Sequence, residues 1–160
     1  MKKFFFLFAF FSLISFAQEN KVDSTLAFPI GSKFILSMET KDNINYTYKV
    51  KNFEIYQNIV TYFKTEKLFA EKPEENTIEI IFCYGKPFDN STEKDYKTVL
   101  LLRNNTKVAL SYNALIKLPD KEDFTNTSTL PIVPKARGTE IWPYPIEAIG
   151  LINFTKYEQK

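Results

Sequence analysis

The chain has 160 residues, of which 44% are hydrophobic and 25% charged, with one cysteine, no histidine and a formal charge of +2. This length fits one domain, or at most two very small ones. Without histidine there is no Ser-His-Asp triad, no Cys-His pair, no histidine metal site and no histidine general base. A single cysteine excludes an intramolecular disulfide and a multi-cysteine zinc or iron–sulfur site. The composition therefore excludes more functions than it indicates.

The first 17 residues carry the three parts of a secretory signal peptide. Met1-Lys2-Lys3 is a basic start, residues 4–16 are almost entirely apolar, and the small residues Ser15 and Ala17 precede a cleavage position before Gln18. A membrane anchor is the alternative interpretation, but the apolar run is shorter than the roughly 20 residues that span a bilayer. The short, phenylalanine-rich segment resembles the signals of Gram-negative bacteria. We expect cleavage near Ala17-Gln18 and a periplasmic or secreted protein.

Removal of residues 1–17 changes the charge of what remains. Lys2 and Lys3 leave with the signal, so the remaining 143 residues have a formal charge of zero. A neutral chain gives no reason to expect a nucleic-acid partner, and it contains no apolar run that predicts a transmembrane segment. Residues 18–28 are polar and unpatterned, which predicts a flexible leader before a single domain over 29–160. A domain of this size can fold without disulfides.

Alternation of apolar and polar residues dominates the first part of that domain. It predicts two half-buried strands joined at Lys41-Asp42-Asn43, so residues 33–50 form a hairpin. The parity then reverses at Phe53, which indicates either a bulge near Lys51-Asn52 or the start of a new element. Residues 53–70 favour a strand because they are rich in β-branched and aromatic residues. A short helix is the alternative, since five of their apolar residues also share one helical face.

The middle of the chain holds the most apolar segments. Residues 78–84 and 99–102 are apolar on both faces, which predicts strands covered on both sides, and Cys83 within the first is expected to be a buried, inert thiol. Asn104-Asn105 suits a tight hairpin turn, and a long strand is expected over 107–118. The segment 119–137 is polar and contains Pro131 and Pro134, so we expect irregular or edge structure. A closing strand over 146–154 is expected, with a bulge at Gly150.

Seven or eight short strands without helical patterning predict an all-β fold. We expect an antiparallel, immunoglobulin-like β-sandwich, with a small β-barrel as the alternative. The segment Thr98–Leu118 resembles the middle hairpins of bacterial immunoglobulin-like accessory domains: an apolar strand, an Asn-Asn turn and a long strand carrying Tyr112. This resemblance concerns architecture and implies no functional residue.

Carboxylates are numerous, but their positions do not predict catalysis. Glu79 is the one acid within a strongly apolar strand, and it is either a perturbed acid or, as we favour, the exposed position of that strand. Asp120, Glu122 and Asp123 share one loop whose spacing does not match a twelve-residue calcium loop, so a solvated turn is expected. The sequence gives no indication of a metal site, a cofactor or an enzymatic activity.

Trp142-Pro143-Tyr144-Pro145 is the most distinctive local motif. Its prolines hold the chain extended and remove two backbone donors. The candidate binding residues are Trp142, Tyr144 and Arg137, because exposed aromatic and arginine side chains dominate many recognition surfaces. In the competing interpretation, Trp142 fills one end of the core and the prolines form a corner.

These observations predict an exported, non-enzymatic binding or accessory module of a bacterial envelope, whose partner is a protein or a glycan. Two alternatives remain open: a small-ligand carrier with a cavity inside a barrel, and a secreted inhibitor that neutralises a toxin. The exact role does not follow from the sequence.

Overall fold

The structure is a computed structural model that describes residues 26–158. The expected signal peptide (1–17) and most of the expected leader lie outside these residues. Ten strands and one short 3-10 helix form the described part: β1 (Ala27–Pro29), β2 (Ser32–Thr40), β3 (Asn45–Ile55), β4 (Val60–Thr61), β5 (Thr77–Lys86), η1 (Glu93–Asp95), β6 (Lys97–Asn104), β7 (Leu110–Lys117), β8 (Phe124–Thr127), β9 (Arg137–Trp142) and β10 (Ala148–Lys156).

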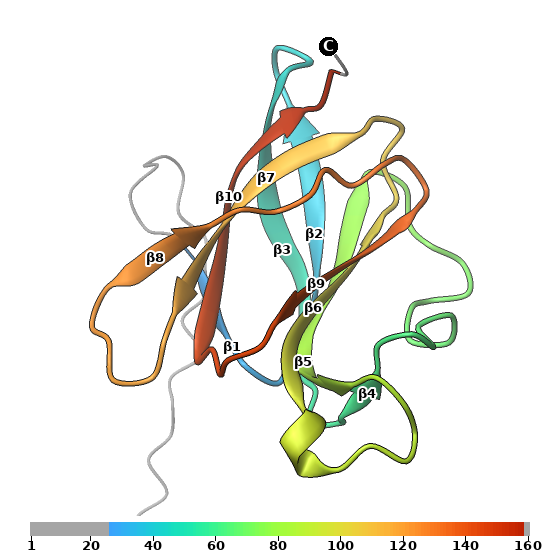
Figure 1. Cartoon of the computed structure of the whole chain (residues 1–160). Helices are drawn as coiled ribbons and strands as arrows, with labels where there is room; N and C mark the ends of the chain where they lie inside the picture. The colour runs from blue at the N-terminus through green and yellow to red at the C-terminus, as the bar shows by residue number, and fades with distance from the viewer. Residues whose placement is uncertain (1–25, 159–160) are drawn as a thin grey trace, which may run out of the picture.

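The strands form one curled sheet in the order β8-β7-β10-β3-β2-β5-β6-β9, with β1 beside β10 and β4 beside β5. Every pair is antiparallel except β4 with β5. Figure 1 shows how the sheet curls around its inner face into a half-barrel. The predicted antiparallel all-β fold is confirmed, in a form consistent with a β-sandwich or a barrel-like fold.

The first hairpin agrees with the sequence pattern. β2 and β3 pair along their length, and the turn between them is held by Asp42, whose carboxylate accepts hydrogen bonds from the backbone amides of Ile44 and Asn45 at 2.9 and 2.7 Å. Ile35 pairs with Asn52 and Leu36 with Val50, so Lys51 is the extra residue of a β-bulge. The bulge predicted near Lys51-Asn52 is therefore confirmed, and it explains why the apolar parity reverses at Phe53.

The strand predicted for residues 53–70 is only partly present. The segment is extended at 53–55, which ends β3, and at 60–61, which forms β4; turns and irregular chain make up the rest, and none of it is helical. The segment turns back over the outer face of β5 and β6, where Val60 and Phe69 are buried. Its apolar residues reflect this covering role, which has no fixed period.

β5 and β6 are buried on both faces, as their sequences predicted. Ile80 and Phe82 point into the main core, whereas Ile81 and Cys83 point outward into a second cluster beneath the 56–70 segment. The main core fills the inside of the half-barrel; its largest fully buried side chains are Phe34, Leu36, Ile78, Ile80, Phe82, Leu100, Leu102, Leu110, Ile146 and Phe154.

The hairpin expected around Asn104-Asn105 is wrong. β6 pairs with β5 and β9, while β7 pairs with β10 and β8, so the two strands that flank these asparagines are not neighbours. Both side chains are buried and bonded: Asn104 Nδ2 donates to the carbonyls of Val108 and Ile132, each at 2.9 Å, and Asn105 Nδ2 donates to Glu79 at 2.8 Å. The Asn104 amide thus satisfies buried backbone carbonyls, and the Asn105 amide satisfies buried side chains, where the chain crosses between distant strands. β7 is correspondingly shorter than the strand expected over 107–118.

Both ends of the described chain join the sheet. Ala27 and Phe28 belong to β1, and Phe28 is buried, so the boundary of the expected leader at residue 28 is two residues too late. The closing strand is present as β10, but its bulge lies near Asn153, where the pairing with β7 shifts register, and not at Gly150. Asn153 has a φ of 55°, which asparagine tolerates better than most residues.

Side chains close the gap between the two terminal strands of the sheet, β8 and β9. The Leu130 amide donates to Glu140 Oε1 at 2.8 Å, and Trp142 Nε1 donates to Thr127 Oγ1 at 3.4 Å. An isolated bridge between Leu110 and Ile132 holds the intervening chain against β7. The segment 119–137 thus contains the edge strand β8 and an irregular connection to β9, in line with its expected irregular or edge structure.

Candidate functional site: a tyrosine-lined groove

At the end of the sheet shown lowest in Figure 1, the side chains of the inner face change from buried to exposed. Tyr84 of β5, Thr98 of β6 and Trp142 of β9 lie opposite one another in the last inward row. Trp142 is 6% exposed and belongs to the main core, whereas Tyr84 is 40% exposed. The core therefore ends at Trp142, and the row continues into solvent through Tyr84.

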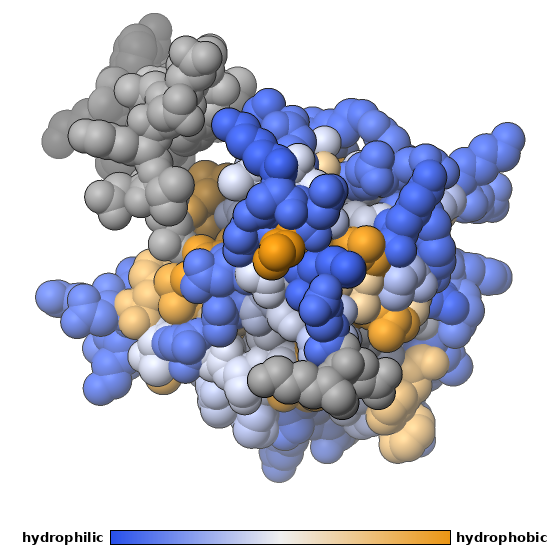
Figure 2. Space-filling view, turned by 90° about the horizontal axis from the view of Figure 1, so that it is seen from above, coloured by the Kyte–Doolittle hydropathy of each residue, from blue (hydrophilic) through white to orange (hydrophobic). Residues whose placement is uncertain are grey.

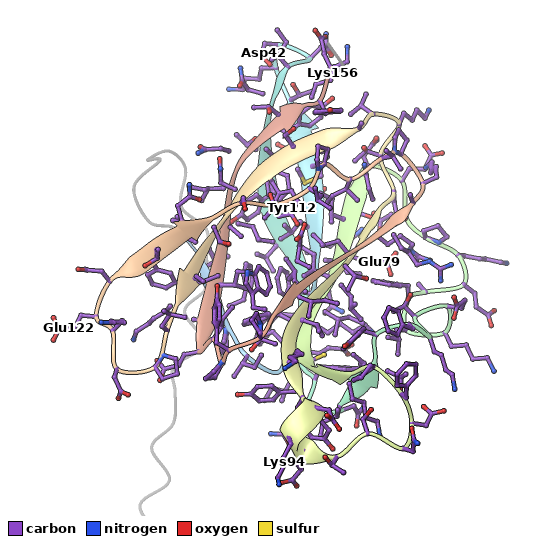
Figure 3. All side chains as sticks on the ribbon, in the orientation of Figure 1. Asp42, Glu79, Lys94, Tyr112, Glu122 and Lys156 are labelled. Atoms are coloured by element: carbon purple, nitrogen blue, oxygen red, sulfur yellow. The ribbon has the colours of Figure 1, made fainter. Side chains whose placement is uncertain are left out.

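A hollow of about 290 Å³ lies beside this row. Its walls combine three aromatic rings (Tyr84, Tyr96, Tyr144) and two prolines with the polar Glu93 and Thr98. Thr98 Oγ1 donates to the Tyr144 carbonyl at 2.8 Å, which ties the extended segment 143–145 to β6. The opposite wall follows η1, the short helix that carries Lys94 in Figure 3. A capping box of Thr92 and Asp95 fixes this helix and so positions Glu93 and Tyr96.

A second hollow, of about 240 Å³, adjoins the first. Tyr84 lines both, and the second is completed by Cys83 and by residues of the chain segments 30–31 and 56–59. Gly31 joins these segments: its φ is 82°, its amide donates to the Phe82 carbonyl at 2.9 Å, and its carbonyl accepts from the Tyr56 amide at 2.7 Å. We call the two hollows together, with Tyr56, Tyr84, Tyr96, Tyr144 and Glu93 as their defining residues, the tyrosine groove.

The tyrosine groove contains one charged side chain, that of Glu93. Over residues 26–158, the Glu93 carboxylate makes no ion pair or hydrogen bond, and the hydroxyls of Tyr84, Tyr96 and Tyr144 make no hydrogen bond. Burial raises the pKa of Tyr56 above its usual value of 10.0, and it raises the pKa of the Cys83 thiol to about 12. Tyr56 is therefore a neutral hydrogen-bonding group at physiological pH, and Cys83 is an inert wall.

The structure separates the three residues singled out in the sequence. Trp142 is the core plug of the competing interpretation, Tyr144 lines the groove with 41% of its surface exposed, and Arg137 pairs with Arg103 at the other end of β9. Five residues of extended strand place Arg137 about 17 Å from Trp142. Of these three, only Tyr144 lines the groove.

The sequence pattern did not indicate the other residues of the groove. Tyr84 follows the apolar row of Ile78, Ile80 and Phe82, so its position indicates one more core residue, and Tyr96 lies in a polar stretch without periodicity. Tyr56, Tyr84, Tyr96 and Tyr144 meet because four separate chain segments converge at one end of the half-barrel. The one local signal was a tyrosine near the end of a largely apolar strand.

The expectation that Glu79 is exposed is wrong. Its side chain lies in the outer row with Ile81 and Cys83, and the segment leading to β5 covers that row. Glu79 forms an ion pair with Arg103, directly across the strand pair, and accepts from the Ala70 amide at 3.1 Å and from Asn105 at 2.8 Å. The Arg103 guanidinium also stacks over the Phe69 ring at 5.3 Å. The carboxylate is saturated by partners, so it holds the covering segment in place.

The three acids at 120–123 are exposed in the structure, as a solvated turn requires, and Asp120 has a φ of 62°. In the described part of the chain, no three acidic or cysteine side chains gather as a metal site needs. Nor does any helix between residues 26 and 158 have the length and apolar character to cross a membrane.

Comparison with known proteins found no match: no family model, no curated protein and no solved structure matches this chain.

Proposed function

We propose that this protein is an exported, non-enzymatic binding or accessory module of a bacterial envelope, and that the tyrosine groove is its recognition surface. The observation that carries the proposal is the groove itself. Exposed tyrosine rings with available hydroxyls are typical of protein recognition surfaces.

Rigidity supports this role. The groove walls are fixed by the bond between Thr98 and Tyr144, by Pro143 and Pro145 and by the capping box at η1. A surface that is already ordered loses little conformational entropy on binding, which favours affinity. Glu93 is the one acid among the residues that line the groove. Acid–base catalysis by a pair of carboxylates needs two.

Export rests on the first 17 residues. Their basic start, apolar run and small residues before Gln18 support delivery to the periplasm or the exterior. Mass spectrometry of the protein recovered from the periplasmic fraction tests this directly. The proposal expects a chain that begins at Gln18; an intact N-terminus on a protein retained in the cytoplasm would contradict it.

The two alternative functions receive less support. A carrier with a barrel cavity needs internal space, but the inside of the half-barrel is filled by Phe34, Phe82, Phe154 and their neighbours. Toxin neutralisation has no specific structural observation in its favour.

Photocrosslinking in living cells tests the proposed recognition surface. A photoreactive phenylalanine derivative replaces Tyr96 in the groove or, as control, Tyr157, which is 41% exposed beyond the end of β10. We expect a discrete crosslinked species from position 96 only, and its sensitivity to protease or glycosidase identifies the class of partner. Crosslinks of equal yield from both positions, or none from position 96, would refute the proposal.

A further inference from the structure

We propose that the occupant of the tyrosine groove is an extended, proline-rich peptide segment of another protein that carries a basic residue. This inference rests on the proposed function and specifies its partner. It follows from the shape of the groove, its hydrogen-bonding groups and its charge.

The shape favours an extended ligand. The two hollows measure about 290 and 240 Å³ and are open to solvent, and Tyr84 forms the boundary between them. The first lies at the lower limit, and the second just below it, of the roughly 300–1,000 Å³ typical of sites that enclose a compact small molecule. A chain that lies across Tyr84 contacts both hollows without being enclosed by either.

The chemistry of the walls favours a polyproline II peptide. Such a helix is preformed, repeats every three residues at about 3.1 Å per residue, and exposes its carbonyls to hydrogen-bond donors. Aromatic-lined grooves bind it by packing the proline rings between flat side chains. Tyr84, Tyr96 and Tyr144 supply both the flat rings and the hydroxyl donors, because their hydroxyls have no acceptor among residues 26–158.

The charge of the groove adds specificity. Glu93 lies at the wall of the first hollow without a cation from the described chain, and no positive side chain lines either hollow. For an anionic ligand, no lysine or arginine among the lining residues would offset the negative charge of Glu93. A lysine or arginine next to the prolines would pair with Glu93 and stack on a neighbouring tyrosine ring, which fixes the direction of the peptide.

Titration of the purified protein with defined probes tests the inference. The main probe is an acetylated peptide of about ten residues in which proline pairs flank one arginine. The same peptide with glutamate in place of arginine tests the charge, the same peptide with alanine in place of proline tests the conformation, and a neutral glucose oligosaccharide tests a glycan ligand. Binding is followed by isothermal titration calorimetry, and thermal unfolding verifies that each variant is folded.

We expect the arginine peptide to bind and the alanine-substituted peptide not to bind. Tyr96→Ala should weaken binding by at least roughly tenfold, as expected for a central aromatic contact. Glu93→Gln should weaken it about threefold and remove the preference for arginine over glutamate. Tyr157→Ala, the matched control, should leave the affinity unchanged.

Two results would overturn the inference. The first is no binding of the arginine peptide at concentrations up to about 1 mM, which corresponds to a free energy weaker than about −4 kcal/mol. The second is binding that Tyr96→Ala does not affect. If the oligosaccharide binds in its place and needs Tyr96, the peptide inference fails while the proposed function stands. Absence of crosslinks from position 96 in cells would instead remove the proposed function itself.

Discussion

The two ends of the half-barrel treat their exposed side chains differently. At the upper end, which carries Asp42 and Lys156 in Figure 3, charged groups are paired with one another: Lys49 with Glu39 and Lys156 with Glu158 at 3.0 and 3.3 Å. Figure 2 shows this end as mostly hydrophilic, with separate apolar residues between the charges. At the lower end, tyrosine rings are exposed and Glu93 has no partner in the described chain. The lower end thus brings three tyrosine rings and a carboxylate without a partner in the described chain around one hollow, where they are available for recognition.

The largest effect on stability is expected at the boundary between core and groove. Trp142→Ala removes a side chain that is 6% exposed and closes the lower end of the core. We expect the free energy of unfolding to fall by about 3–5 kcal/mol, the usual cost of such a truncation in a core. Urea denaturation followed by circular dichroism measures the loss. Ile141→Ala on the exposed side of β9 is the control, and an equal loss there would show that Trp142 is no plug.

A slightly smaller loss is expected for the outer cover of β5 and β6. Glu79→Ala leaves Arg103, Asn105 and the Ala70 amide without their shared acceptor. Breaking a buried pair from one side costs about 3 kcal/mol, and the double variant Glu79→Leu with Arg103→Met should lose less than Glu79→Ala alone. The same denaturation experiment compares the two. A double variant less stable than Glu79→Ala would contradict the account of a saturated structural ion pair.

Cys83 reports on the second hollow of the tyrosine groove. Because burial raises the pKa of the thiol to about 12, its thiolate fraction at pH 8 is roughly a thousandfold below that of a thiol with the reference pKa of 9.0. Greater nucleophilicity offsets part of this difference, but the residue is also only 1% exposed, so alkylation by iodoacetamide should be at least roughly 50-fold slower than in the urea-unfolded protein. Mass spectrometry measures both rates. Similar rates would mean that the wall of the hollow opens in solution.

The smallest effect is expected at the upper end. Hydrogen bonds from Asn45 and Ile44 lower the pKa of Asp42 from 3.8 to about 2. A lowered pKa in the folded state means that Asp42 stabilises the fold above pH 4 and that this contribution is lost as the pH falls toward 2. Asp42→Asn should therefore flatten the pH dependence of the thermal unfolding midpoint between pH 4 and 2. Asp123→Asn, in an exposed loop, is the control; identical curves for the two variants would contradict this role of Asp42.

The sequence correctly predicted those parts of the fold that depend on neighbouring residues along one strand. Alternating apolar residues predicted β2 and β3, and the change of parity at Phe53 indicated either a bulge near Lys51-Asn52 or a new element, of which the structure has the bulge. The apolar runs around Ile81 and Leu101 correctly indicated strands covered on both faces. In each case the order of apolar and polar residues along the strand indicates which of its faces are buried.

Long-range contacts decide what the sequence did not reveal. Asn104 and Asn105 suit a tight turn equally well, but they bond to Ile132, Thr77 and Glu79, which lie 26 to 28 residues away. Glu79 is buried because a distant segment covers its row. The tyrosine groove likewise joins four chain segments, of which only the motif around Tyr144 was distinctive in sequence.

Two tyrosines of equal exposure give the most direct test of the recognition surface. Tyr144 in the groove and Tyr157 at the upper end are each 41% exposed. Oxidative footprinting compares their modification in the purified protein and in intact cells. The account predicts equal modification of both in the purified protein and selective protection of Tyr144 in cells. Equal modification of both in cells would contradict it, because the groove would then be unoccupied where the protein acts.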